Sequence, residues 1–178
     1  ATFFWGERTY VMGVVNVTPD SFSGDGLDSD VEAAVGQGVQ FQDWGADIID
    51  VGGESTRPAS IYSGAGPASQ EEELSRVIPV IESLAARLRI PISVDTYKSS
   101  VASKALAAGA SMINDVWGFG RDSDMAAVAA ETGVPVVLMH NQDNTHYDDL
   151  VPDVIGALRG MAEGAVRAGV ASQNVILD

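Results

Sequence analysis

Apolar runs of strand length alternate with segments of helical periodicity along the whole chain. The aliphatic runs predict strands at 10–17, 46–52, 90–95, 111–116, 134–140 and 174–178. Helical spacing of apolar residues predicts helices near 30–44, after the capping-box pattern Ser69-x-x-Glu72, and near 98–108, 123–132 and 151–168. Because parallel strands require crossover connections, this strict order predicts a parallel sheet of the α/β class.

Two architectures with such a sheet fit the pattern, an open doubly wound sheet and a TIM (β/α)8 barrel. No GxGxxG motif follows the first predicted strand, which weakens the case for an open nucleotide-binding sheet. Units of similar size with a polar residue at nearly every strand end favour the barrel. We therefore predict a TIM (β/α)8 barrel.

The length of the chain sets a limit on this barrel. A complete (β/α)8 barrel typically needs about 250 residues, whereas the chain has 178. We expect one domain over residues 1–178, with about the first six strands and five helices, that stops inside the sixth strand. Such a chain would be the N-terminal part of a longer protein or would be completed by another chain. Its first and sixth strands would be edges with exposed apolar faces.

The composition excludes several classes of function. Twenty-five acidic residues against ten basic ones give a net charge of −15, and no Lys/Arg cluster occurs, so nucleic acid and anionic membranes are poor candidates for partners. The absence of cysteine excludes disulfides, thiolate metal sites and cysteine nucleophiles. The sequence begins without a basic segment followed by a long apolar run, which predicts a cytoplasmic protein.

Polar residues stand where the predicted strands end. They are Asn16, Glu54 to Arg57, Asp95, Asn114 with Asp115, His140 with Asn141, and Asp178. In a parallel barrel these positions converge on one mouth, where active sites form. Each residue taken alone could instead cap a helix, form a turn or hold a loop.

The chemistry of this set suits one kind of ligand. Carboxylates and amides such as Asp95, Asn114 and Asp178 can accept and donate parallel hydrogen bonds to a flat heterocycle rich in N–H groups and ring nitrogens. Met139 could form an apolar wall for such a ring, or could simply fill the core. Nothing in the sequence resembles a Ser-His-Asp triad, a zinc ligand cluster or a P-loop.

Six motifs in order along the chain carry a family resemblance: NVTPDSFS (16–23), GGESTRP (52–58), SVDTYK (93–98), INDVWGF (113–119), LMHN (138–141) and VILD (175–178). The sequence resembles the dihydropteroate synthases, the enzymes of folate biosynthesis that sulfonamides inhibit. The resemblance implies a (β/α)8 barrel that joins 6-hydroxymethyl-7,8-dihydropterin diphosphate to p-aminobenzoate and releases diphosphate. It also implies Mg²⁺ as cofactor and a homodimer for the full-length protein.

The resemblance also assigns roles to residues. It implies that the pterin is bound by Asp95, Asn114, Asp178 and Met139, and that Asn16 contributes to the Mg²⁺ site. It implies that p-aminobenzoate and diphosphate are bound by Thr56, Arg57, Phe22 and Pro58. Lys98 and Arg57 are the basic residues expected near the mouth to meet a diphosphate. No strong nucleophile is needed, because in this family diphosphate leaves first and the amine attacks the resulting cation.

Two departures from the family pattern matter. The first loop reads Ser-Phe-Ser-Gly-Asp-Gly where the family has SFSDGG, so the carboxylate has moved by one place, and we predict Asp25 as a substitute cation stabiliser. We predict Asp95, Arg57 and Asp25 as the catalytic residues. The family's late Lys and Arg-x-His motifs do not occur within the 178 residues, so we expect that this chain is not a self-sufficient enzyme.

Two other functions remain open at this point. An inactive pterin-binding scaffold would keep the fold without turnover, and the missing late motifs favour it. A corrinoid-dependent, pterin-using methyltransferase would share the barrel and the pterin-facing Asp and Asn. The loops 16–23 and 52–58 argue against the methyltransferase, because methyl transfer needs neither a p-aminobenzoate pocket nor a diphosphate site.

Overall fold

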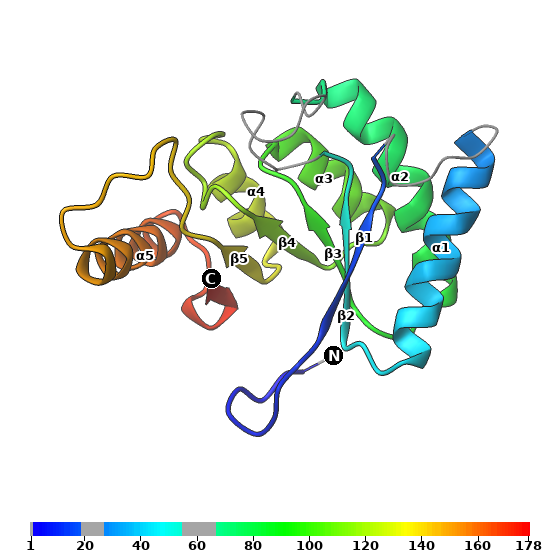
Figure 1. Cartoon of the computed structure of the whole chain (residues 1–178), viewed down its shortest axis with the longest axis horizontal. Coiled ribbons are helices and arrows are strands. Elements are labelled where there is room, and N and C mark those ends of the chain that lie inside the picture. The colour runs from blue at the N-terminus through cyan, green and yellow to red at the C-terminus, as the bar shows by residue number, and fades with distance from the viewer. Residues whose placement is uncertain (1, 19–26, 55–66) are drawn as a thin grey trace.

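A computed structural model describes residues 2–18, 27–54 and 67–178 of the chain. Its strands form one six-stranded parallel sheet in the order β1-β2-β3-β4-β5-β6, with helices between successive strands (Figure 1). The strands are β1 (Met12–Asn16), β2 (Ile48–Gly52), β3 (Ile92–Asp95), β4 (Met112–Asp115), β5 (Val136–Leu138) and β6 (Val175–Leu177). The helices are α1 (Leu27–Asp43), α2 (Gln70–Arg87), α3 (Ser99–Ala108), α4 (Met125–Thr132) and α5 (Leu150–Arg167).

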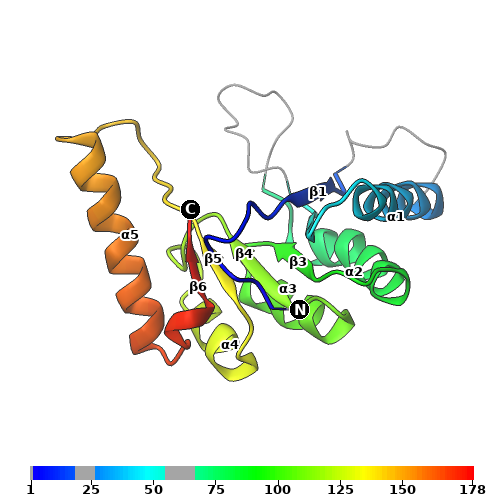
Figure 2. The ribbon, with the colours of Figure 1, turned by 90° about the horizontal axis from the view of Figure 1, so that it is seen from below.

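The strand order decides between the open doubly wound sheet and the barrel. A doubly wound sheet reverses its order at a switch point, whereas here every strand is added beside the preceding one. The helices consequently follow one another round the outside of a curved sheet, as Figure 2 shows from below. The described residues thus form six strands and five helices of a barrel-type fold, and the fold class predicted from the sequence is confirmed.

Hydrogen bonds at the helix starts explain where two helices begin. The Ser69 hydroxyl accepts a hydrogen bond from the Glu72 amide (3.2 Å), and the Glu72 carboxylate accepts one from the Ser69 amide (2.8 Å), which is the predicted capping box of α2. At α3 the cap comes from elsewhere in the chain, because the Asp122 carboxylate accepts from the Ser99 amide at 2.8 Å. Asp122 therefore ties the segment before α4 to the start of α3.

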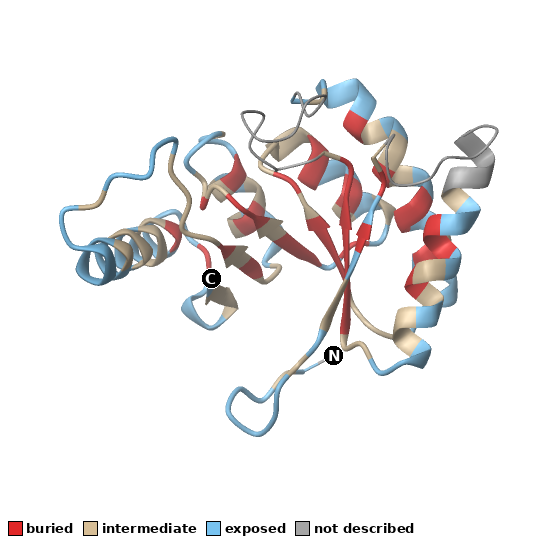
Figure 3. Ribbon diagram, viewed as in Figure 1, coloured by how far each residue is buried: buried red, intermediate tan, exposed pale blue. Residues whose placement is uncertain are grey.

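The hydrophobic core lies between the sheet and the helices. Alternate strand residues such as Val15, Val51 and Ile113 are fully buried there and belong to one core cluster with helix residues such as Leu84. Figure 3 shows the buried positions gathered on the strands and on the helices that cover them. Gly38 on α1 lets α2 approach closely, since a Cβ at this position would lie 2.7 Å from Leu84 Cδ2. Because side chains alternate along a strand, the residue next to each of these core residues points to the opposite, concave face of the sheet.

The two outer strands of the described sheet carry exposed apolar residues. Val14 on β1 is 47% exposed and Leu177 on β6 is 43% exposed. The expected exposure of apolar side chains on these strands is confirmed. Among the described residues, no helix has the length and apolar character needed to cross a membrane.

Candidate active site

Four adjacent strands place one residue each in a single layer on the concave face. Asn16 pairs in register with Gly52, Gly52 with Asp95, and Asp95 with Asn114. Their neighbours toward the N-terminus, including Val15 and Val94, point into the core on the other face. The structure thus brings together three of the residues predicted from the sequence, Asn16, Asp95 and Asn114.

Gly52 keeps the layer open between Asn16 and Asp95. A Cβ at Gly52 would lie 3.3 Å from Asp95 Oδ2 and 3.7 Å from Asn16 Oδ1. Contacts at 3.3 Å are tighter than ordinary van der Waals packing allows without a shift of the neighbour. The absence of a side chain at position 52 therefore leaves two oxygen atoms of different strands on either side of one small space.

Asp95 is the acidic residue of this layer, and one of its oxygen atoms has no hydrogen-bond partner among the described residues. This atom, Oδ1, is buried. Burial is the main reason that the pKa of Asp95 is raised from 3.8 to about 8. Four carboxylates add to the effect: Asp50, Glu73, Asp115 and Glu54. A ligand with N–H groups would supply the donors that the protein lacks here.

Asp50 holds Asn114 in one orientation, and sequence reasoning did not identify it. Asn114 Nδ2 donates a hydrogen bond of 2.9 Å to Asp50 Oδ2, and Asp50 is only 2% exposed. Burial raises the pKa of Asp50, while the nearby Ser93 hydroxyl and the Asn114 amide act in the opposite direction. Its signal in the sequence is a carboxylate in the middle of the apolar run Ile-Ile-Asp-Val-Gly at 48–52.

The remaining described candidates follow β5 and β6. Val137 on β5 pairs with Asn114. Because side chains alternate between the faces of a strand, Met139, two residues further along the chain, lies on the same face as Val137, and it is half-buried. The Asp178 amide donates to the Leu138 carbonyl at 3.0 Å, and its own carbonyl accepts from the His140 amide at 2.9 Å. The Asp178 side chain is exposed, two strands beyond Asn114, so it is not part of the Asp95 layer.

The structure does not leave Lys98 free to meet a diphosphate. Its ammonium contacts Glu54 Oε2 and lies 2.5 Å from Glu73 Oε2. Glu54, which the sequence placed at the mouth as a possible anchor for its own loop, is thus paired with a residue beyond β3. The other predicted residues lie outside the described residues: Phe22, Asp25, Thr56, Arg57 and Pro58.

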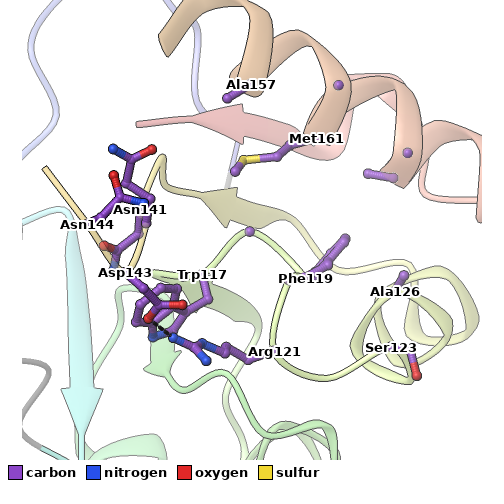
Figure 4. A pocket seen from close by; sticks show the side chains of 16 residues that line it. Trp117, Phe119, Arg121, Ser123, Ala126, Asn141, Asp143, Asn144, Ala157 and Met161 are labelled. Carbon is purple, nitrogen blue, oxygen red and sulfur yellow. Dashed lines mark hydrogen bonds and ion pairs between the residues drawn. The ribbon is translucent and has the colours of Figure 1, made fainter. Parts of the chain in front are cut away.

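A separate groove lies between α5 and the segments that follow β4 and β5. Trp117, Phe119 and Met161 are among its apolar lining residues, as Figure 4 shows. The Arg121 guanidinium lies over the Trp117 ring, 4.0 Å from the ring centroid, and pairs with Asp143. Neither Asp95 nor any other member of its layer lines this groove, so the candidate active site is the layer on the concave face.

Comparison with known proteins decides the family. Residues 12–178 match the model of a family described as pterin binding enzyme. The chain belongs to the pterin binding enzyme family. A dihydropteroate synthase of Clostridium beijerinckii is 52% identical over 173 residues, which are 97% of this chain and 62% of that protein. The resemblance identified from the six motifs is confirmed.

Solved structures of dihydropteroate synthases share the fold. The enzyme of Clostridium difficile, solved in the presence of pteroic acid, has a TM-score of 0.93 at 46% identity and covers 99% of this chain and 66% of its own. The enzyme of Xanthomonas albilineans, solved with 4-aminobenzoic acid, has a TM-score of 0.89 at 48% identity and covers 97% and 61%. The chain therefore spans less than two thirds of the length of these relatives.

Proposed function

We propose that this chain carries the pterin site of a dihydropteroate synthase. The reaction would join 6-hydroxymethyl-7,8-dihydropterin diphosphate to p-aminobenzoate, giving 7,8-dihydropteroate and diphosphate. The observation that carries the proposal is the buried Asp95 carboxyl, which has an unpartnered oxygen beside an asparagine of fixed orientation. Two relatives were solved with compounds related to this reaction, one in the presence of pteroic acid and one with 4-aminobenzoic acid, and this supports the proposal.

The described residues suit a pterin ring. A pterin edge presents several N–H donors and ring nitrogens, which Asp95 and Asn114 can bind with acceptors and donors on neighbouring strands. Because Asn114 Nδ2 already donates one hydrogen to Asp50, its second amide hydrogen and its oxygen are available to the ligand. We assign Met139 to the apolar wall of the ring and Asp178 to the far edge of the same ligand.

The proposed reaction needs electrostatic stabilisation more than a nucleophile. The C–O bond to diphosphate breaks first, leaving a cation at the pterin methylene carbon. The amine nitrogen of p-aminobenzoate then forms a C–N bond to this carbon and loses a proton. Asp95 would stabilise the cation through the pterin ring. The predictions for Asp25, Arg57, Thr56, Phe22 and Pro58 concern the amine and the diphosphate, and they remain predictions.

The metal ligands available near Asn16 fit a magnesium ion whose other ligands come mainly from the bound substrate. Mg²⁺ prefers hard oxygen ligands, usually keeps several waters and takes only one or two protein ligands beside substrate phosphates. Asn16 offers one amide oxygen at the open mouth, and the described residues contain no cluster of three or more acidic, histidine or cysteine side chains that could hold a metal alone. When bound, Mg²⁺ would stabilise the negative charge of the leaving diphosphate.

The test is release of diphosphate on adding p-aminobenzoate to protein, Mg²⁺ and the pterin diphosphate. It is run on the 178-residue chain and on a chimera that adds the remaining C-terminal part of the Clostridium beijerinckii relative. We expect turnover in the chimera and its loss in Asp95→Asn, with Asp43→Asn on the exposed end of α1 as the matched control. Asn16→Ala should raise the Mg²⁺ concentration needed for half-maximal rate.

Other outcomes would favour the rival functions. Pterin binding without turnover in the chimera would support the inactive scaffold. Pterin binding with methyl transfer and no diphosphate release would support the methyltransferase. The homodimer implied by the resemblance is a separate prediction, and sedimentation of the chimera at equilibrium would test it.

A further inference from the structure

Lys98 joins three parts of the chain beside the proposed pterin site. Its ammonium contacts Glu54 at the end of β2 and Glu73 in the first turns of α2, while Lys98 itself lies between β3 and α3. The side chains of Lys98, Glu54 and Glu73 are 17%, 10% and 1% exposed. This cluster is therefore largely removed from water, unlike the exposed ion pairs elsewhere in the described structure.

Tyr97 completes the contacts of Glu54. The Tyr97 hydroxyl donates to Glu54 Oε1 at 3.0 Å, so both carboxylate oxygens of Glu54 are bound by consecutive residues. The Lys98 ammonium also lies 4.6 Å from the centroid of the Tyr97 ring. Next to Glu54, the Gly53 carbonyl accepts a hydrogen bond of 2.8 Å from Arg76 on α2. The end of β2 is thus fixed both to α2 and to the turn after β3.

The packing around Gly53 leaves little freedom for this arrangement to change. A Cβ at Gly53 would lie 2.7 Å from Val77 Cγ1 and 3.1 Å from Glu73 Cγ. Burial by itself would lower the pKa of Lys98, but hydrogen bonds with Glu54 and Glu73 raise it above its ordinary value. Moving this ammonium to another anion would leave the buried Glu73 charge without a counterion, which is strongly unfavourable.

Two members of the cluster, Glu54 and Glu73, act on Asp95, which stands two residues before Tyr97. The charged groups that face Asp95 are Asp50 on β2, Glu54 just after β2, Glu73 on α2 and Asp115 on β4. All four are acidic, and Lys98 is the cation in contact with two of them. Because the Lys98 ammonium lies against Glu54 and Glu73, we expect its positive charge to offset part of the repulsion that these two carboxylates exert on Asp95.

We propose that Lys98 is a positioning residue of the pterin site. By binding Glu54 and Glu73 together, it fixes the end of β2 against the turn that follows Asp95 and offsets two charges that oppose ionisation of the Asp95 carboxyl. Lys98 in this role touches no substrate. The proposal deepens the proposed function, on which it rests for the identity of the ligand that ionised Asp95 binds.

The first measurement needs no ligand. The carboxyl carbon of Asp95 is titrated by NMR in the labelled 178-residue chain, with its signal assigned by its loss in Asp95→Asn. In Lys98→Met we expect the midpoint to rise by about one pH unit, because the positive charge beside Glu54 and Glu73 is lost. Glu73→Gln alone should lower the midpoint. Lys104→Met, which changes an exposed lysine of the following helix α3, is the matched control and should leave the midpoint unchanged.

The double variant Lys98→Met/Glu73→Gln guards against a failure to fold. It removes one positive and one negative charge, so the fully buried Glu73 charge is not left without a counterion, and the Asp95 midpoint should return toward the wild-type value. Lys98→Arg keeps the charge and should also keep the midpoint. A loss of thermal stability in Lys98→Met with an unchanged Asp95 midpoint would overturn the proposal and leave Lys98 a purely structural role.

The second measurement is binding of pteroic acid over the same pH range. Lys98→Met should weaken binding about tenfold at pH 7, and the loss should disappear at pH values above both midpoints. A loss of equal size at every pH would overturn the proposal. If the wild-type chain binds no pteroic acid at any pH, the proposed function fails, and the NMR titration still decides the role of Lys98.

Discussion

Replacing Asp95 by asparagine should make the protein more stable while it removes the group proposed to bind pterin. The side chain keeps its size and can still accept hydrogen bonds, but it carries no charge at any pH. Asp95 is buried among four other carboxylates and one of its oxygens has no partner in the described structure. The wild-type protein therefore maintains an unfavourable carboxyl at this position.

The size of the effect follows from the two pKa values. Burial, followed by the neighbouring carboxylates, raises the pKa of Asp95 from 3.8 to about 8 in the folded protein. Between these values the folded state retains the proton and the unfolded state does not. The free energy of unfolding consequently falls as pH rises through this window, by about 1.4 kcal/mol per pH unit. At pH 7 the accumulated loss is about 4 kcal/mol.

Relaxation of neighbouring groups and entry of water reduce such costs in real proteins, so we expect Asp95→Asn to gain about 2 kcal/mol or more at pH 7. Urea unfolding followed by circular dichroism measures the gain at several pH values between about 5 and 8. The gain should be small at the acidic end and should grow with pH. A gain independent of pH, or a loss, would refute the assignment of Asp95 as a destabilised buried carboxyl.

Asp122→Asn provides a comparison of opposite sign. Although burial acts to raise the pKa of Asp122, hydrogen bonds from the Ser99 and Asp124 amides lower it overall. A carboxyl with a lowered pKa stabilises the fold above its ordinary pKa, and this contribution is lost as pH falls. Asp122→Asn should therefore destabilise the protein at pH 7, whereas Asp95→Asn should stabilise it.

Three further substitutions test the site and the core. Asp50→Val leaves Asn114 Nδ2 without its acceptor, so pteroic acid should bind about tenfold more weakly or worse in calorimetry, and unchanged affinity would exclude the orienting role. Gly52→Ala places a Cβ 3.3 Å from Asp95 Oδ2, so it should weaken pteroic acid binding with little change in thermal midpoint; normal binding would show that this space is not used. Leu84→Ala removes a fully buried core side chain and should lower the free energy of unfolding by about 2–5 kcal/mol in urea, and a smaller loss would mean that the core closes around the cavity.

Local patterns in the sequence were sufficient for the elements and for part of the site. Strand alternation, helical spacing and the Ser69–Glu72 capping box depend on neighbours within a few residues. The structure has these elements in the predicted order, with ends that differ from the predicted ones by up to three residues. Asn16, Asp95 and Asn114 could be placed at one mouth, because parallel strands bring their carboxyl ends to the same edge of a sheet. Motif identity gave the family without any coordinates.

Contacts between distant residues could not be derived in this way. Lys98 was expected at a diphosphate, but tertiary packing places two glutamates from other elements against its ammonium. Asp50 was not identified from the sequence, because its role is to accept a hydrogen bond from the Asn114 amide, which is 64 residues away in the sequence. The sequence alone therefore determined the order of the elements, the residues at the strand ends and the family. Only the tertiary structure decided which charges meet, because register and helix packing set these distances and burial sets the ionisation of each group.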